Sequence, residues 1–428
     1  MTEDSRRAIE AVWRIEAAKL IAGLARVVRD VGVAEELAQD ALVVALETWP
    51  RTGVPDNPGA WLMAAAKNRA LDQLRRYKML EQKHVQLAAE MDLAHEIASR
   101  ERSEAVDAAL DDDIGDDLLR LVFTACHPVL SPEARVALTL KMIGGLTTAE
   151  IARAYLVPEP TIAQRLVRAK RTLSEARVPF EVPRGTELEA RLASVLEVIY
   201  LVFNEGFAAS SGEEWTRPAL CEEALRLGRV LAGLMPEERE VHGLVALMEI
   251  QASRLHARVG LDGEPVLLLD QDRARWDQLL IRRGLAALGR AESLGGALGP
   301  YTLQAAIAAC HARARAASET DWVRIAALYD ALSQVIASPV VELNRAVAVG
   351  MAFGPAAGLE IVDSLRDEPT MKGYHLLPSV RADFLGRLGR NDEANQAWKQ
   401  AAALTRNVRE RELLLARART EGPPPVTP

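Results

Sequence analysis

The sequence predicts an all-α protein: two small helical domains, the second a helix-turn-helix, joined by an acidic linker and followed by a large helical domain. Three observations support this fold class. Apolar residues recur at helical spacing through most of the 428 residues. Prolines and capping residues mark where these segments begin, and short amphipathic segments occur in pairs towards the C-terminus. A hydrophobic content of 49% is enough for two or three cores.

The first domain is predicted over residues 5–80, with an acidic helix at 34–49 and a cationic helix at 58–76. Pro58 starts the cationic helix, and Trp61, Asn68 and Arg75 share a stripe separate from the apolar one. This combination suits single-stranded DNA, because an indole stacks on an unpaired base while basic groups hold phosphates. The alternative, favoured for Trp61 taken alone, is that its ring belongs to the core.

A linker is predicted over residues 81–117, and it is strongly acidic. From His84 to Asp117 it holds only two basic residues, Arg100 and Arg102. Runs of this kind are usually solvated or flank a helix.

A helix-turn-helix is predicted over residues 118–180. Thr147 and Glu150 have the spacing of a capping box, and the two prolines of residues 157–160 impose a turn, so the second helix is expected to begin near Glu159. Its buried stripe is predicted to consist of Ile162, Leu166, Ala169 and Leu173. Its opposite face carries groups that grip phosphates and read base edges, namely Thr161, Gln164, Arg165, Arg168 and Arg171.

Three motifs together resemble an extracytoplasmic-function sigma factor of bacterial RNA polymerase. They are residues 34–41 (AEELAQDA), residues 58–76 (PGAWLMAAAKNRALDQLRR) and the hairpin that ends in residues 165–170 (RLVRAK). The resemblance covers residues 5–178. The remainder is similar to the subgroup of these factors that carries a long helical extension with tetratricopeptide-like repeats.

The resemblance implies a role for each motif. The acidic helix would dock on the coiled coil of the largest catalytic polymerase subunit through Glu36, Gln39 and Asp40. The cationic helix would capture flipped bases of the minus-10 element through Trp61, Lys67, Asn68, Arg69, Arg75 and Arg76. The second hairpin helix would read the minus-35 element through Thr161, Gln164, Arg165, Arg168 and Arg171. For the acidic linker, with Asp111–Asp113, Asp116 and Asp117, the resemblance implies a mimic of nucleic-acid charge in the polymerase channel, whereas a solvated or helix-flanking segment is favoured for most of it.

One departure from the family pattern is visible at the start of the second hairpin helix. Glu159 and Pro160 replace the small, flexible residues usual there. The approach of this first turn to DNA is therefore left open.

The net charge of −8 also bears on the partners. A DNA-binding protein that acts alone is usually basic, because nonspecific affinity comes from phosphate neutralisation. A protein held on DNA by a large partner needs no such charge, since its second contact becomes effectively intramolecular. The expected partners are core RNA polymerase and promoter DNA.

The C-terminal part is predicted as a helical extension over 186–295 and repeats over 296–420, after a hinge at 182–185. Two of the helices expected in the extension cover residues 236–259 and 274–294. The best fit to the tetratricopeptide pattern is the pair 376–388 and 393–404. Such arrays bind peptides or proteins on a concave side, so a regulatory protein or peptide is a possible partner. An equally weighted alternative is a helical lid on the N-terminal half. Asn204–Phe207 is interpreted as a turn, with packing favoured over ligand contact.

Catalytic and metal-binding signals are weak, so no enzyme activity, cofactor or metal site is expected. Cys126, Cys221 and Cys310 are widely spaced and odd in number, which indicates a reducing compartment. With no apolar run of membrane-spanning length and no signal-peptide core, a cytoplasmic protein without membrane contact is expected.

Two functions from different classes follow. The preferred one is a transcription initiation factor that directs core polymerase to promoters and aids their opening, with the C-terminal domain acting in place of, or alongside, a separate anti-sigma protein. The alternative is a helical-repeat interaction scaffold, or a DNA-binding regulator, that acts without polymerase.

Overall fold

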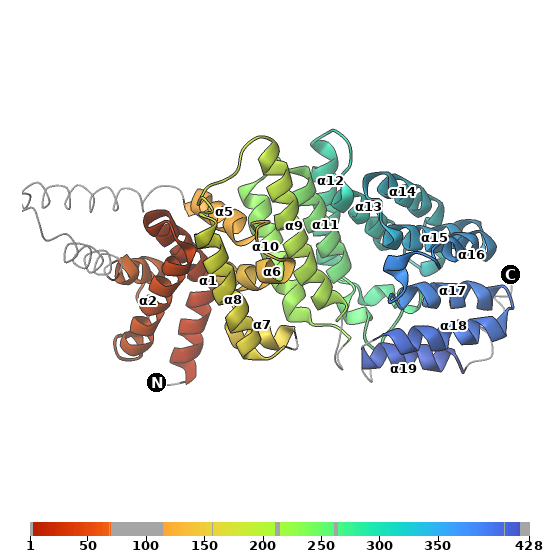
Figure 1. The fold of residues 1–428 in the computed structure, drawn as a ribbon, viewed down its shortest axis with the longest axis horizontal. Coiled ribbons are helices and arrows are strands. Elements are labelled where there is room, and N and C mark those ends of the chain that lie inside the picture. Colours follow the sequence, from red (N-terminus) through yellow and green to blue (C-terminus); the bar gives the residue numbers. More distant parts are fainter. Residues whose placement is uncertain are drawn as a thin grey trace, which may run out of the picture. The chain divides into compact units, whose positions relative to one another are not determined.

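The computed structural model describes residues 3–67, 69, 114–155, 157–209, 215–260, 264–405 and 407–419. These residues confirm the predicted all-α class (Figure 1). The β structure within them is an isolated antiparallel bridge between Val259 and Pro265. The chain divides into two compact units, residues 1–199 and 200–428.

The first unit begins with two long helices, α1 (Glu3–Val28) and α2 (Val31–Thr52). The turn between them is short because Asp30 caps α2, its carboxylate accepting hydrogen bonds from the backbone N–H groups of Gly32 (2.7 Å) and Val33 (3.0 Å). A further helix covers residues 58–67 and begins at the predicted Pro58. The rest of the predicted cationic helix, apart from residue 69, lies outside the described residues.

Four more helices of the first unit follow: α5 (Ile114–Ala125), α6 (Pro132–Met142), α7 (Thr148–Ala154) and α8 (Glu159–Glu175). The helix α5 starts inside the segment predicted as acidic linker. Its Asp117 is only 3% exposed and pairs with Arg26 at 3.2 Å and with Arg120 at 2.5 Å. Asp117 is therefore a structural residue of the core, and its predicted part in a nucleic-acid mimic is wrong. Residues 81–113 of the linker are outside the described residues.

The helix α9 (Thr186–Phe207) is shared by the two units. Its first half packs against the end of α5. Arg191 donates from Nη2 to the carbonyl oxygen of Phe123 (3.0 Å), and Ser194 donates from Oγ to that of Cys126 (2.6 Å). The division of contacts at residues 199 and 200 thus falls beyond the hinge predicted at 182–185.

The second unit continues with α10 (Pro218–Leu234), α11 (Arg239–Ala252) and α12 (Gln278–Ser293). The helices expected over 236–259 and 274–294 are both shorter in the structure, so their predicted bounds are wrong. The first helix stops at Ala252, and the next turn is the 3₁₀ helix η1 (Leu255–Ala257). The second starts late because Asp277 caps Gln278–Ser293 and donates its backbone N–H to the Ser253 carbonyl at 2.7 Å. Two more 3₁₀ helices, η2 (Leu268–Asp270) and η3 (Arg273–Arg275), precede that cap.

Seven helices and two 3₁₀ helices follow in the second unit. They are α13 (Pro300–Arg313), η4 (Ala317–Glu319), α14 (Trp322–Val335), α15 (Pro339–Phe353), α16 (Pro355–Ser364), η5 (Pro369–Met371), α17 (Leu376–Arg387), α18 (Asn391–Leu404) and α19 (Val408–Arg417). Figure 1 shows them as consecutive antiparallel hairpins, and each helix from α13 to α18 packs against the next. Close packing at one crossing depends on glycine: a Cβ on Gly350 or Gly358 would lie 2.4 or 2.6 Å from ring atoms of buried Phe384.

The two ends of the second unit also meet. The side-chain amide of Asn407 donates from Nδ2 to the carbonyl oxygen of Ala209, at 3.2 Å. No described helix has both the length and the apolar character needed to cross a membrane.

Candidate nucleic-acid interface

The hairpin that presents the candidate interface is fixed by its caps. Glu150 accepts a hydrogen bond from the backbone N–H of Thr147 (2.8 Å), and Thr147 Oγ1 accepts one from that of Glu150 (3.1 Å), which confirms the capping box. Arg14 of α1 also contacts Glu150, at 2.6 Å. Burial raises the pKa of Glu150, but these hydrogen bonds and Arg14 outweigh burial and lower it below the ordinary value. The start of α7 is thereby tied to α1.

The second hairpin helix, α8, begins at Glu159 as predicted, with Pro160 in its first turn. Its predicted apolar stripe is confirmed, because the four residues that α8 buries are Ile162, Leu166, Ala169 and Leu173. Packing of this stripe fixes the rotation of the helix. Because the apolar stripe faces the core, the opposite face of α8 is presented to solvent.

Four of the five predicted minus-35 residues gather in one place. A hollow of about 400 Å³ lies between α8 and the α5–α6 connection. Its polar lining includes Thr161, Gln164, Arg165, Arg168, Ser131 and Glu133. Arg171 does not line the hollow; it is 76% exposed and pairs with Glu175 at 2.6 Å on its own helix.

Arg165 and Arg168 form no ion pair within the part of the chain that the structure describes. The acidic residue that lines the hollow with them is Glu133. Hydrogen bonds from its own backbone N–H and from Ser131, with a contribution from Arg165, lower the pKa of Glu133. Two uncommitted guanidinium groups beside an amide, Gln164, make an arrangement that can accept phosphate or guanine edges.

Of the predicted minus-10 residues, Trp61, Lys67 and Arg69 fall within the described residues. The Trp61 ring is half-buried and stands edge-on to buried Trp49, with centroids 5.2 Å apart, so it is part core and part surface. Lys67 is half-buried, and Arg69 pairs with Asp40 of α2 at 2.7 Å. Asn68, Arg75 and Arg76 lie outside the described residues.

The predicted polymerase-docking residues differ in their surroundings. Glu36 is exposed, whereas Gln39 is half-buried and donates from Nε2 to Glu35 Oε1. Asp40 is committed to Arg69. Of these three residues, only Glu36 projects without a partner among the described residues, and the Asp40–Arg69 pair links α2 to the cationic helix.

Sequence reasoning missed the role of Glu35. This carboxylate is 5% exposed and accepts an ion pair from Lys170 of α8 at 2.8 Å, with Lys141 of α6 at 3.9 Å. The signal available in the sequence was a glutamate at a position of the apolar stripe of α2, between buried Ala34 and Leu37. A glutamate there needs a cation, and the sequence does not say which one.

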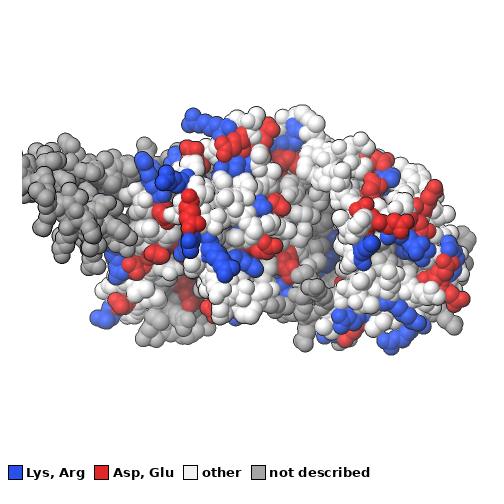
Figure 2. Space-filling model, viewed as in Figure 1, with Lys and Arg blue, Asp and Glu red and all other residues white. Residues whose placement is uncertain are grey.

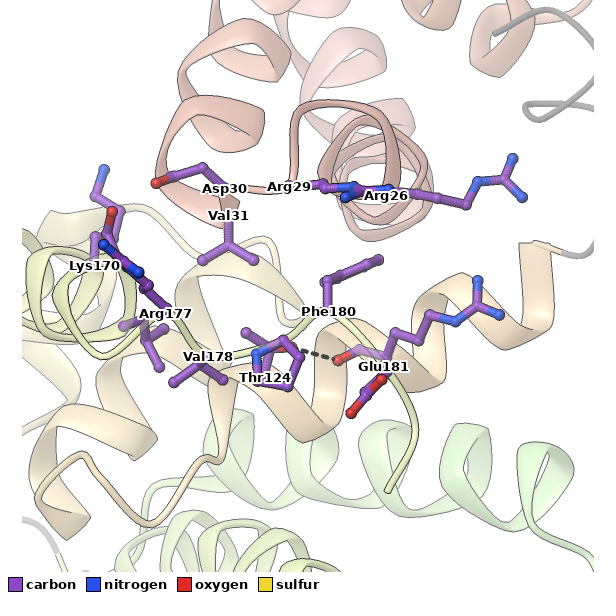
Figure 3. A pocket seen from close by; sticks show the side chains of 14 residues that line it. Arg26, Arg29, Asp30, Val31, Thr124, Lys170, Arg177, Val178, Phe180 and Glu181 are labelled. Atoms are coloured by element: carbon purple, nitrogen blue, oxygen red, sulfur yellow. Dashed lines mark hydrogen bonds between the residues drawn. The ribbon is translucent and has the colours of Figure 1, made fainter. Parts of the chain in front are cut away.

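A second hollow, of about 690 Å³, lies where α1, α2, α5 and the end of α8 meet, and no sequence pattern indicated it (Figure 3). Five cationic side chains line it, from Arg26, Arg29, Arg120, Lys170 and Arg177. Both Arg29 (φ 55°) and Arg177 (φ 49°) adopt the left-handed backbone conformation that favours glycine. The first unit therefore has a cationic hollow beside the end of α8.

Charge is otherwise mixed over the surface. Figure 2 shows Lys and Arg interspersed with Asp and Glu among the described residues of the face in view. This agrees with a net charge of −8. The positive charge suited to binding nucleic acid is therefore local, on α8 and in the hollows beside it.

Comparisons with known proteins agree with this geometry. Residues 15–79 match the family described as Sigma-70 region 2, residues 120–173 match Sigma-70, region 4, and residues 191–292 match a family of unknown function, DUF6596. An uncharacterized protein of Rhizobium meliloti is 42% identical over 387 residues, covering 90% of this chain and 89% of the relative.

Two mycobacterial relatives carry a functional name. SigK of Mycobacterium ulcerans, an ECF RNA polymerase sigma factor, is 32% identical over 155 residues, which span 35% of this chain and 75% of SigK. SigI of Mycobacterium tuberculosis, a probable ECF RNA polymerase sigma factor, is 29% identical over 174 residues, 41% of this chain and 57% of SigI. No solved structure matches the chain.

Proposed function

Because this chain belongs to the extracytoplasmic-function family of RNA polymerase sigma factors, we propose that it directs core polymerase to a specific set of promoters and aids their opening. The observation that carries this proposal is the exposed face of α8. There Gln164, Arg165 and Arg168 line one hollow, and neither arginine has a carboxylate partner among the described residues. In this proposal these side chains read the minus-35 element, and Arg171 contacts the backbone.

The minus-10 element is proposed to be bound by the helix that starts at Pro58. Trp61 is supported as a stacking group by its half-buried ring, which buried Trp49 holds in one orientation. A ring fixed in this way loses little conformational entropy when an unpaired base stacks on it. Lys67, Asn68, Arg69, Arg75 and Arg76 are proposed as its polar and cationic neighbours.

Docking on polymerase is proposed for the exposed side of α2, with Glu36 at its centre. Glu36 is exposed and is not tied to another described residue. Gln39, which contacts Glu35, and Asp40, which contacts Arg69, belong to the same proposed surface. This surface and the minus-35 reader occupy one compact unit.

For the second unit we propose a regulatory or supporting role through tetratricopeptide-like helix pairs. Support comes from the consecutive antiparallel packing of α13 to α18 and from the glycines that admit Phe384 between helices. A protein or peptide partner is the kind of ligand that such arrays take.

A run-off transcription assay tests the main proposal. The full chain is mixed with core RNA polymerase and a promoter from its own upstream region, and a specific transcript is expected only when both proteins are present. The variant Arg165→Ala should weaken that transcript, whereas Val167→Ala, on an exposed part of α8 away from the hollow, should not. A scaffold, or a regulator that acts alone, would give no transcript and would shift duplex DNA without polymerase.

The role of the second unit is tested by truncation after Phe207, which keeps the whole of α9. This piece retains Arg191 and Ser194, which tie α9 to α5, so loss of activity is not caused by exposing the first unit's core. If the second unit inhibits, the truncated chain transcribes more than the full chain. If the second unit assists, the truncated chain transcribes less than the full chain. In both cases the helix content of the truncated chain, measured by circular dichroism, should stay in proportion to its length.

A further inference from the structure

Two guanidinium groups in the second unit lie on one aromatic ring. Arg254 follows the end of α11, and Arg258 follows η1 one turn later. Their Cζ atoms are 5.1 and 3.9 Å from the centroid of the Phe207 ring, and Arg258 is also 5.3 Å from Trp215. Two positive charges are thereby brought together at the end of α9.

Neither group has a carboxylate partner among the residues that the structure describes. Arg254 donates from Nε and Nη2 to the neutral Gln251 Oε1, at 2.9 and 2.6 Å. Arg258 is 9% exposed, its Nε is fully buried without a hydrogen-bond partner, and no described atom accepts from the rest of its guanidinium group.

The other two described arginines that are as buried as Arg258 are treated differently. Arg135 (8% exposed) and Arg191 (6% exposed) of the first unit each have an acidic partner, Glu197 at 3.0 Å and Glu187 at 3.0 Å. Proteins rarely bury a charge without a counter-charge, because desolvation is not repaid. Arg258 is therefore an exception among the buried arginines, and Arg254 on the same ring adds a second unpaired charge beside it.

The surroundings add to the excess of positive charge. Arg273 of η3 donates to the carbonyl oxygens of His311 and Ala314 and to Thr320 Oγ1, and forms no ion pair in the described chain. Burial, then repulsion from Arg258 and Arg273, lowers the pKa of Arg254 to about 9, and burial lowers the pKa of Arg258 to about 10. Since guanidinium groups stay protonated at neutral pH, these shifts indicate positive charge held without compensation.

We propose that Arg254 and Arg258 form a binding site for a ligand that presents an anionic oxygen group, a phosphate or a carboxylate. A planar guanidinium group donates two parallel hydrogen bonds to either group. Phe207 and Trp215 hold Arg258 by cation–π contacts, so its orientation is set before a ligand arrives. Arg254, Phe207 and Trp215 are half-buried, so part of each remains in contact with solvent.

The segment Asn204–Phe207, interpreted from sequence as a packed turn, is the base of this site. A Cβ on Gly206 would lie 2.7 Å from the backbone nitrogen of Cys221, so glycine lets α10 approach the end of α9. Glu205 pairs with Arg217, whose backbone N–H donates to the Gly206 carbonyl at 2.7 Å. Together these contacts fix Phe207 beneath the two arginines.

Thermal unfolding of the full chain tests the site without polymerase, so its outcome is separate from that of the proposed function. Inorganic phosphate and, in a second arm, sodium citrate are titrated at constant ionic strength, with sodium chloride as the balancing salt. A ligand of the folded state raises the unfolding temperature progressively with the logarithm of its concentration. The arm with the larger shift identifies phosphate or carboxylate as the preferred group.

Matched variants separate binding from general salt effects, because excluded anions stabilise every protein. Arg254→Gln and Arg258→Gln should each lose the part of the shift that exceeds the general effect. Arg345→Gln, whose arginine is paired with acidic residues, should keep it. Two separate variants guard against a packing defect in one of them. Equal shifts in the wild type and in both glutamine variants, in both arms, would overturn the proposal.

Discussion

Lys170 of the reader helix donates to Glu35 of α2 at 2.8 Å, and the two residues are 135 positions apart in the chain. Glu35 is buried, and Lys141 approaches the same carboxylate at 3.9 Å. The helix proposed to dock on polymerase is thus joined to the helix proposed to read the minus-35 element. In the chain without polymerase, the two parts form one compact unit.

Removing the charge of Glu35 should destabilise this unit. In Glu35→Gln, Lys170 and Lys141 would keep their partly buried charges without a carboxylate, and we expect the free energy of unfolding to fall by about 2 kcal/mol. Urea denaturation measures the change, and Glu36→Gln on the exposed side of the same helix is the control. A loss no greater than that of the control would mean that the ion pair contributes little.

The arginines of α8 should differ in their effect on promoter binding. Arg165→Ala or Arg168→Ala should cost about 1–3 kcal/mol and relax the sequence preference at one position of the minus-35 element. Arg171→Ala should cost less and act equally on all sequences, because Arg171 is highly exposed and already paired with Glu175. Competition binding of the holoenzyme to promoters with single substitutions measures both quantities. The same loss of specificity in all three variants would contradict the assignment.

Substitutions of Glu36 and of Asp40 should have different effects on assembly and on promoter binding. Glu36→Ala should weaken assembly with core polymerase and leave the free energy of unfolding unchanged, since the side chain is exposed. Asp40→Ala should weaken assembly and also alter minus-10 binding, because it releases Arg69 from a 2.7 Å ion pair. Fluorescence anisotropy with labelled core polymerase, followed by promoter titration of the assembled complex, distinguishes the two steps. Identical behaviour of the variants would argue against separate roles.

Local signals explain what the sequence allowed us to predict. The capping box of Thr147 and Glu150 and the buried stripe from Ile162 to Leu173 depend on residues three or four positions apart, and the structure confirms both. Pairings between distant residues had no such signal. Asp117 belongs to a run of acidic residues that suggests solvent exposure, yet Arg26 of α1 covers it. Nothing in the sequence pairs Glu35 with Lys170.

Helix ends in the second unit were predicted less well for a related reason. The end of α11 at Ala252 is set by a contact with the distant Asp277, which caps α12 and bonds to Ser253. Arg254 and Arg258 follow this break, so their meeting on Phe207 depends on tertiary structure. Sequence indicated the types of residues at the candidate sites, and packing decided which of them meet.

His311 should make the second unit sensitive to acid. Burial, then the charges of Arg254 and Arg273, lowers the pKa of His311 from 6.5 to about 4. Between these values the unfolded chain binds a proton that the folded chain does not, so stability that is complete above pH 6.5 is lost as the pH falls towards 4. The loss due to this residue should approach about 3 kcal/mol.

Denaturation of His311→Gln between pH 7 and pH 4 measures that contribution. The variant should lose less stability over this range than the wild type, while His256→Gln, at an exposed position, should follow the wild type. Parallel curves for all three chains would show that the His311 ring does not titrate in this window.

The three cysteines should be unreactive in the folded chain. All are buried and free, and burial raises the pKa of Cys126 to about 11 and that of Cys221 to about 12, and also raises the pKa of Cys310. At pH 8 thiolate would be scarce, so a disulfide reagent should react at least roughly 100-fold more slowly than with the unfolded chain. Rapid reaction of one thiol under native conditions would reveal local opening at that cysteine.

Permanganate footprinting of promoter melting is the most direct test of the central claim that this chain is a sigma factor with two readers spaced by polymerase. Thymines of the minus-10 element should become reactive only when the chain and core polymerase are both present. Insertion of half a helical turn, about 5 base pairs, between the two elements should abolish that reactivity. Reactivity that needs no polymerase, or that survives the insertion, would contradict the account.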